Sequence, residues 1–225
     1  MRYLKDIYTP YKTRLERTKF SIEKLLPINN DDTILSVGGG GENYLSTILD
    51  NFNIKAKGVE IDIAGNPDYK INLEKIDKLP FKNNEFSFLI LNDIIEHIEN
   101  FHLVLNESFR IAKKKLIISL PIPSNDFVLI IKSKKYNPPL KDGGLYNKFY
   151  GLPHETPIDR HKWWFTHEDA LAFFDNYEKI NNCEISTFTD FFKPAGIQNK
   201  LAKLFLSKRL YKNFFHNAVW FIIEK

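Results

Sequence analysis

Residues 33–42 read Thr-Ile-Leu-Ser-Val-Gly-Gly-Gly-Gly-Glu, an apolar run that breaks into four glycines, and a helix-like segment, 43–49, follows them. Glycine lets the backbone turn sharply and pass close to a bound ligand, because it has no Cβ. A helix that begins at such a loop offers free N–H groups to the same ligand. The stretch therefore predicts a strand, a ligand-binding loop and a helix.

A second apolar run, 56–59, ends in Glu60, about twenty residues after Gly40. A carboxylate at the end of the second strand can accept hydrogen bonds from a ribose. The glycines could instead form a flexible turn, and Glu60 could be a solvated strand end. A nicotinamide site fits less well, because Asn43 stands where the third glycine of G-x-G-x-x-G belongs. We interpret the two features together as a site for a nucleoside-containing cofactor.

The composition is that of an ordinary globular domain: of 225 residues, 43% are hydrophobic and 27% charged. The single cysteine, Cys183, excludes an internal disulfide and is compatible with a reducing cytoplasm. No apolar segment is long enough for a secretion signal or a membrane span, so we expect a cytoplasmic protein. The net charge of +4 is mild and does not by itself imply nucleic acid.

Apolar runs and helical periodicity alternate along most of the chain, which favours a parallel sheet covered on both faces. We read residues 1–30 as helical and 121–162 as a proline-rich inserted lid. The expected strands are 33–37, 54–60, 69–73, 86–92, 116–120, 183–188 and 218–223, and the expected later helices are 94–112, 166–174 and 197–215.

Four segments together resemble class I S-adenosylmethionine-dependent methyltransferases of the small-molecule group called type 11. They read ILSVGGGGENYL, GVEID, LPFKNNEFSFLILNDIIEHI and ESFRIAKKKLIISLP, and DRHKWWFTHEDA is similar to the segment after the lid of these enzymes. The resemblance spans roughly residues 20–190. It implies one doubly wound α/β domain over 1–225, a three-layer α/β/α sandwich with a Rossmann-like sheet of seven strands, the last antiparallel. It also implies that residues 191–216 form a basic helical insertion before the last strand.

The resemblance also implies roles for individual residues. Gly38 and Gly40 would line the methionine part of S-adenosylmethionine, and Glu60 would bind its ribose. Asn72 and Leu73 would meet the adenine.

Asn92 and Asp93, after the fourth strand, would lie beside the sulfonium and face the substrate, with Asp93 as a catalytic residue. Three positions depart from the family pattern: Ser36 and Asn72 replace acids, and Glu42 replaces the third glycine. Ser36 can still accept a hydrogen bond at the cofactor, and Glu42 could supply a negative charge. These departures leave a second hypothesis open, in which the chain is a degenerate, non-catalytic module that binds the cofactor or a partner.

Asp93, Glu96 and His97 admit three readings. They could complement the positive end of a helix, or Asp93 could face the substrate. They could also hold a divalent metal, as is thought of some quinone-pathway O-methyltransferases that share this turn. We assign no metal ligand from the sequence alone.

Three histidines in or beside the lid, His154, His161 and His167, could act as a general base. We prefer His161 as the catalytic base and interpret His167 as a solvent-exposed residue of a first helical turn. The aromatic run 163–165 could be core or an apolar wall of the substrate pocket.

Between 193 and 212 the chain has six basic residues and no acid. The segment could be a solvated helix face, or it could attract an anionic substrate, a lipid headgroup or a phosphate-bearing carrier. The Asn/Asp-Pro-Pro-Tyr/Phe motif of nucleic-acid base methylation is absent after the fourth strand, so we expect no nucleic acid partner. The expected function is methyl transfer, at oxygen, to a small-molecule or carrier-linked acceptor.

Overall fold

The computed structural model describes residues 1–39, 42, 44–124, 160–191 and 196–225, with the backbone alone for 196–200. Most of the predicted lid therefore lies outside the described residues. In chain order the elements are β1 Arg2–Tyr3, β2 Ile7–Tyr8, α1 Arg14–Leu25, β3 Thr33–Val37, α2 Tyr44–Asn51, β4 Lys57–Asp62, β5 Tyr69–Lys70, the 3₁₀ turn η1 Leu73–Lys75, β6 Phe86–Asn92, the 3₁₀ turn η2 Ile95–His97, α3 Phe101–Ile111, β7 Ala112–Pro121, α6 His167–Asn181, β8 Glu184–Phe191, α7 Gly196–Phe205, α8 Lys208–Phe215 and β9 His216–Glu224.

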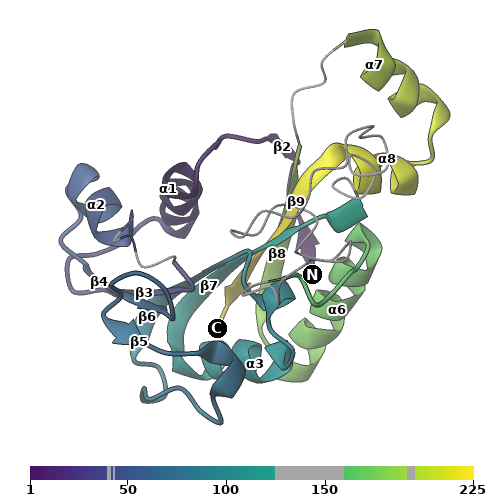
Figure 1. Cartoon of the computed structure of the whole chain (residues 1–225). Coiled ribbons are helices and arrows are strands. Elements are labelled where there is room, and N and C mark those ends of the chain that lie inside the picture. The colour runs from purple at the N-terminus through teal and green to yellow at the C-terminus, as the bar shows by residue number, and fades with distance from the viewer. Residues whose placement is uncertain (40–41, 43, 125–159, 192–195) are drawn as a thin grey trace, which may run out of the picture.

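A single twisted sheet runs through the molecule (Figure 1). Its strand order is β1-β8-β9-β7-β6-β3-β4-β5, and β2 also pairs with β8. Strands β3 to β7 run parallel to one another, whereas β9 lies antiparallel between β7 and β8. The doubly wound fold and its antiparallel last strand are thus confirmed. Strand β3 lies between β4 and β6, so the crevice where the winding reverses opens at the carboxyl ends of these strands.

The described sheet differs from the predicted seven strands because β1 and β2 add to its edge. Residues 1–30 are helical only over α1, and the two short strands before it pair with β8. Edge pairing satisfies the backbone groups that an open edge would expose. Helix α1 begins where Thr13 and Glu16 form a reciprocal capping box.

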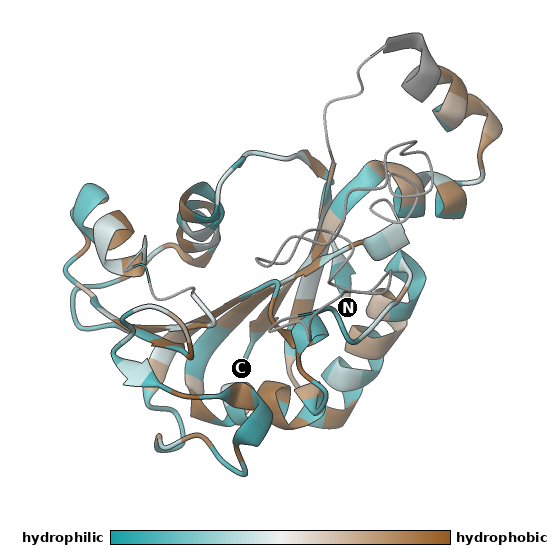
Figure 2. Cartoon of the chain, in the orientation of Figure 1, coloured by the Kyte–Doolittle hydropathy of each residue, from teal (hydrophilic) through white to brown (hydrophobic). Residues whose placement is uncertain are grey.

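Two apolar layers fill the space between the sheet and its helices (Figure 2). Alternate residues of the central strand β6 point to opposite faces, as in any strand. Phe88 and Ile90 pack with residues of α1 and α2, whereas Leu89 and Leu91 pack with residues of α3 and α6. The continuous apolar run of β6 is therefore explained by helices on both faces.

The predicted helices 94–112 and 197–215 are each interrupted. Residues 94–112 form η2 and then α3, because Asp93 adopts a left-handed φ of 51° and the chain re-enters a helix only at Phe101. Residues 197–215 form α7 and α8, since the Ser207 side chain accepts the N–H of Leu210 and so caps a new helix.

Asp190 joins three segments at the buried edge of the sheet. Its carboxylate accepts hydrogen bonds from the Tyr11 hydroxyl, from Trp220 Nε1 at 2.7 Å and from the Ala218 N–H at 3.1 Å. Burial raises the pKa of Asp190, although the donors from Tyr11 and Trp220 oppose that rise. The network ties the N-terminal segment to β8 and β9.

We predict that Asp190→Ala lowers the free energy of unfolding by about 3 kcal/mol, because it leaves buried donors unpaired. Asp190→Asn, which keeps one acceptor oxygen, should cost less. Urea denaturation measures both, and Asp77→Ala at an exposed position is the control, with an expected change within about 0.5 kcal/mol. Equal stability of Asp190→Ala and the parent chain would show that the network does not stabilise the fold.

Candidate cofactor and acceptor site

The glycine loop begins directly after β3. Gly38 has a φ of +70°, and its N–H donates to the carbonyl of Ile61 at 2.8 Å. A Cβ at this position would lie 2.0 Å from Cδ1 of Ile94, a residue of the turn after β6. Glycine is therefore required both by the backbone conformation and by the packing of the two loops. Gly40, predicted as a second cofactor residue, lies outside the described residues.

Glu60 faces this loop from the neighbouring strand. It is 3% exposed and lies opposite Ser36 in the β3–β4 register. Its Oε1 accepts the main-chain N–H of Leu45, in the first turn of α2, at 3.2 Å. Its Oε2 is buried and has no hydrogen-bond partner among the described residues. A buried carboxylate oxygen without a donor is costly, so this atom is suited to the hydroxyl of a ligand.

The backbone of Gly39 passes close to that carboxylate. A Cβ at Gly39 would lie 2.9 Å from Ser36 Oγ and 3.5 Å from the carboxyl carbon of Glu60. Ser36 is buried and neutral, whereas Glu42 is exposed and accepts a hydrogen bond from the hydroxyl of Tyr44. Glu60 is therefore a buried carboxylate facing the loop, whereas Glu42 is exposed to solvent.

The two residues predicted to meet the adenine lie after β5. The side chain of Asn72 caps η1, because its Oδ1 accepts the N–H of Glu74 at 3.0 Å. Leu73 is half-buried and packs against the apolar core. Their contact with a cofactor remains a prediction.

Asn92 and Asp93 stand at the carboxyl end of β6, where helix α1 holds them. The Ser21 hydroxyl donates to Asn92 Oδ1 at 3.0 Å, and Arg17 forms an ion pair with Asp93. Asp93 Oδ1 also accepts the Ser119 hydroxyl at 2.7 Å. Nothing in the sequence pattern pointed to Arg17 or Ser21, because α1 lies far from β6 along the chain. A carboxylate with these two donors is poorly placed to take a proton from a substrate.

Glu96, His97 and His161 form a second cluster beside the first. His97 Nε2 lies 3.7 Å and His161 Nε2 lies 3.9 Å from Oε1 of Glu96, and one ligand atom from each residue falls within 4.8 Å of the others. Glu96 and His161 are buried. Two imidazoles and a carboxylate are a donor set for a divalent transition metal.

Backbone contacts bring His161 to this cluster across a long interval of sequence. The main-chain N–H groups of Lys162 and Trp163 both donate to the carbonyl of Glu96, at 2.8 and 3.3 Å. Trp163 Nε1 donates to the carbonyl of Ile98 at 2.8 Å. The sequence grouped Asp93 with Glu96 and His97 in the metal reading. The structure instead groups His161 with the latter two and pairs Asp93 with Arg17.

An apolar pocket of about 240 Å³ opens next to Glu96. Trp163, Trp164 and Phe165 form one wall of it, as the pocket reading of this aromatic run predicted. Its other lining residues are Ile95, Phe101, Leu120, Asp169, Ala170, Phe173 and Phe174. The pocket lies at the carboxyl ends of β6 and β7, where open α/β sheets bind their ligands.

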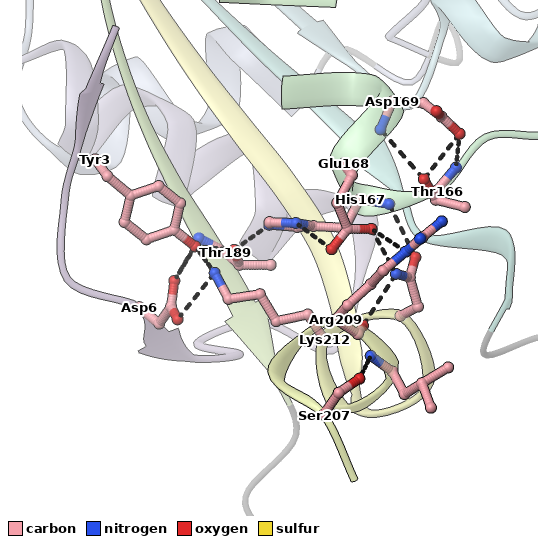
Figure 3. A network of polar contacts seen from close by, with 12 residues as sticks. Tyr3, Asp6, Thr166, His167, Glu168, Asp169, Thr189, Ser207, Arg209 and Lys212 are labelled. Atoms are coloured by element: carbon pink, nitrogen blue, oxygen red, sulfur yellow. Dashed lines mark hydrogen bonds and ion pairs between the residues drawn. The ribbon is translucent and has the colours of Figure 1, made fainter. Parts of the chain in front are cut away.

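The exposure predicted for His167 is wrong. The side chain is 2% exposed, its Nε2 lies 3.2 Å from Thr189 Oγ1, and its N–H donates to Asn213 Oδ1 at 2.9 Å (Figure 3). Burial, together with the nearby charge of Lys212, lowers its pKa to about 4. Helix α8 covers the start of α6, which the sequence could not show. His154 lies outside the described residues, so His161 is the remaining described candidate for a base.

Comparisons with known proteins find similarity in sequence and in fold. Residues 35–120 match the family model of a methyltransferase domain. An uncharacterized protein of Methanocaldococcus jannaschii is 32% identical over 117 residues, which are 49% of this chain and 51% of that protein. The chain thus spans about half the length of this curated relative.

Solved structures show the same fold at low sequence identity. A SAM-dependent methyltransferase from Archaeoglobus fulgidus is similar with a TM-score of 0.50 at 16% identity, covering 95% of both chains. Phosphoethanolamine N-methyltransferase 2 of Haemonchus contortus, in complex with S-adenosyl-L-methionine, is similar with a TM-score of 0.51 at 12% identity, covering 93% of this chain and 52% of that one. By its domain match over residues 35–120 and by its fold, the chain is similar to class I S-adenosylmethionine-dependent methyltransferases.

We predict that Gly38→Ala lowers the free energy of unfolding by about 1–2 kcal/mol, since it combines a strained φ with a clash against Ile94. In an Ile94→Ala background the clash is removed and the strain remains, so the same change should cost less. Urea denaturation of the four chains gives this difference. An equal cost in both backgrounds would show that Ile94 does not restrict the loop.

Proposed function

We propose that the chain transfers a methyl group from S-adenosylmethionine to a hydroxyl oxygen of a small-molecule or carrier-linked acceptor. The observation that carries this proposal is the buried, unpartnered Oε2 of Glu60 beside the glycine loop. A ribose hydroxyl can donate to that oxygen, and the match of residues 35–120 to a methyltransferase domain supports this use.

When bound, S-adenosylmethionine supplies a methyl carbon that its sulfonium already makes electrophilic. The chain then has to hold donor and acceptor in line and exclude water. Gly38 and Gly39 let the loop backbone pass close to the cofactor, and Glu60 fixes its sugar. Asn72 and Leu73 border the adenine, and Asn92 borders the reacting end of the site.

Asp93 takes a positioning role in this proposal rather than that of a base. Its ion pair with Arg17 and its hydrogen bond from Ser119 fix the turn after β6. Ile94, the next residue, touches Gly38, so the same turn shapes the glycine loop. Arg17 and Asp93 thereby couple helix α1 to the cofactor loop.

Transfer to oxygen is favoured by the cluster of Glu96, His97 and His161. A hydroxyl acceptor must lose its proton during or before transfer, and an imidazole can accept it. A divalent cation held by the three side chains would lower the pKa of the acceptor hydroxyl. The adjoining apolar pocket suits an acceptor with an aromatic or aliphatic body.

A non-catalytic module that binds the cofactor or a partner is the second candidate. It is motivated by the neutral Ser36 and Asn72 at positions that are acidic in the family and by Glu42 in the loop. Such a module would bind S-adenosylmethionine without needing the cluster around Glu96. Binding and metal experiments therefore separate the two candidates.

We predict that the chain binds S-adenosylmethionine in isothermal titration calorimetry and that Glu60→Gln weakens the affinity about 10- to 100-fold. The reason is the loss of charge-assisted hydrogen bonds to the ribose. Asp50→Asn, at an exposed position of α2, should leave the affinity unchanged. No heat from the parent chain at millimolar cofactor would refute both the enzyme and the cofactor-binding module.

We also predict that the chain binds Zn²⁺ or Mn²⁺ and that Glu96→Gln and His161→Asn each weaken this binding at least about 10-fold, because each removes a ligand atom. Calorimetry with each metal salt measures the effect, and His102→Asn at an exposed position of α3 is the control. Thermal unfolding checks that each variant is folded.

Two results would overturn the metal interpretation. One is equal metal affinity of Glu96→Gln and the parent chain. The other is methyl transfer that persists unchanged in a chelator, which would leave His161 as a metal-independent base.

A further inference from the structure

Helices α7 and α8 carry an apolar surface that the proposed site does not use. Leu204 and Phe205 are 76% and 78% exposed, and Leu201 and Leu210 are 47% and 43% exposed. Figure 1 shows α7 projecting from the body of the molecule, and Figure 2 shows hydrophobic residues on its described part. Large side chains with this exposure make no contribution to the described core.

The same surface is strongly basic. The segment 193–212 has six basic residues and no acid. The side chains of Lys203, Lys208 and Arg209 are exposed. Leu201, Leu204 and Phe205 recur at helical spacing, so they share one side of α7.

Helix α8 is fixed to the body of the molecule by polar contacts (Figure 3). Lys212 is 7% exposed, its Nζ lies 3.7 Å from Asp6 Oδ2, and it contacts the hydroxyl of Tyr3. Asn213 Nδ2 donates to Glu168 Oε2 at 2.8 Å. Lys212 therefore anchors α8, Arg209 adds an ion pair in which its Nε lies 3.7 Å from Glu168 Oε2, and Lys203 and Lys208 remain exposed at the surface.

We propose that α7 and the start of α8 dock the protein on an anionic lipid bilayer. Leu204 and Phe205 would enter the boundary between headgroups and acyl chains, and the surrounding lysine and arginine side chains would contact the anionic headgroups. Helix α7 lies on the bilayer in this arrangement. Among the described residues, no helix is long and apolar enough to cross a membrane.

The mixture of residues favours a bilayer over a protein partner. Lysine is depleted in protein–protein interfaces, whereas a membrane-surface helix combines lysines with leucine and phenylalanine. A second copy of the chain would place this basic surface against itself, because a two-fold interface uses the same patch on both subunits. Nucleic acid would engage the cations but would leave Leu204 and Phe205 exposed to water.

Co-sedimentation of the full chain with vesicles tests the proposal. Vesicles of phosphatidylcholine mixed with phosphatidylserine should bind the chain, and vesicles of phosphatidylcholine alone should bind it more weakly. Leu204→Ser with Phe205→Ser should lower the partition coefficient at least about 10-fold, because the inserted apolar area is lost. Lys203→Glu with Lys208→Glu should lower it about 10-fold, and added salt should weaken binding of the parent chain.

Matched controls alter exposed residues elsewhere. Ile180→Ser with Ile63→Ser changes side chains that are 72% and 50% exposed, and Lys75→Glu with Lys78→Glu changes exposed charges. Both should leave the partition coefficient unchanged. Circular dichroism verifies folding, and light scattering with each variant reports the molar mass.

Three outcomes would overturn the proposal. The parent chain could fail to bind the mixed vesicles, or the control variants could reduce binding as much as the α7 variants do. The α7 variants could also convert a dimer to a monomer without changing vesicle binding, which would assign the surface to a second copy. None of these measurements depends on methyl transfer, so failure here and failure of the proposed function are distinguishable.

Discussion

The parallel alignment of β3, β4, β6 and β7 is the constraint on which the rest of this structure depends. Because these strands run in one direction, all their carboxyl ends meet at one edge of the sheet. That edge collects the glycine loop, Glu60, the turn after β6 and the aromatic pocket from distant parts of the chain. These strands are buried by packed helices on both faces of the sheet.

Ile94 connects the glycine loop to the turn that carries Asp93 and Glu96. Ile94 contacts Gly38 on the cofactor side, and it lies between Asp93, held by Arg17, and the turn that carries Glu96. A substrate bound over the cluster of Glu96 would therefore be positioned by the same turn that shapes the cofactor loop. Helix α1, through its contacts with Asn92 and Asp93, closes this edge from the side of the N-terminal segment.

The apolar pocket and the proposed membrane-docking surface of α7 both suit an acceptor of low solubility in water. The pocket beside Glu96 has almost entirely apolar walls, which suits an acceptor of low solubility in water. Docking on an anionic bilayer would bring the protein to the phase where such molecules concentrate. The buried network of His167, Lys212 and Asn213 links the two features, since α6 lines the pocket and α8 supports α7.

The sequence by itself determined the order of strands β3 to β9, the glycine loop and Glu60, because apolar runs and glycines record local backbone geometry. Strands β3 and β6 have the predicted bounds. Only the tertiary structure decided which distant side chains meet. The ion pair of Arg17 with Asp93, the approach of His161 to Glu96 and the burial of His167 arise from the packing of elements far apart in the chain. Hydrophobic periodicity predicts that such elements pack, but it does not specify which polar groups that packing brings within hydrogen-bonding distance.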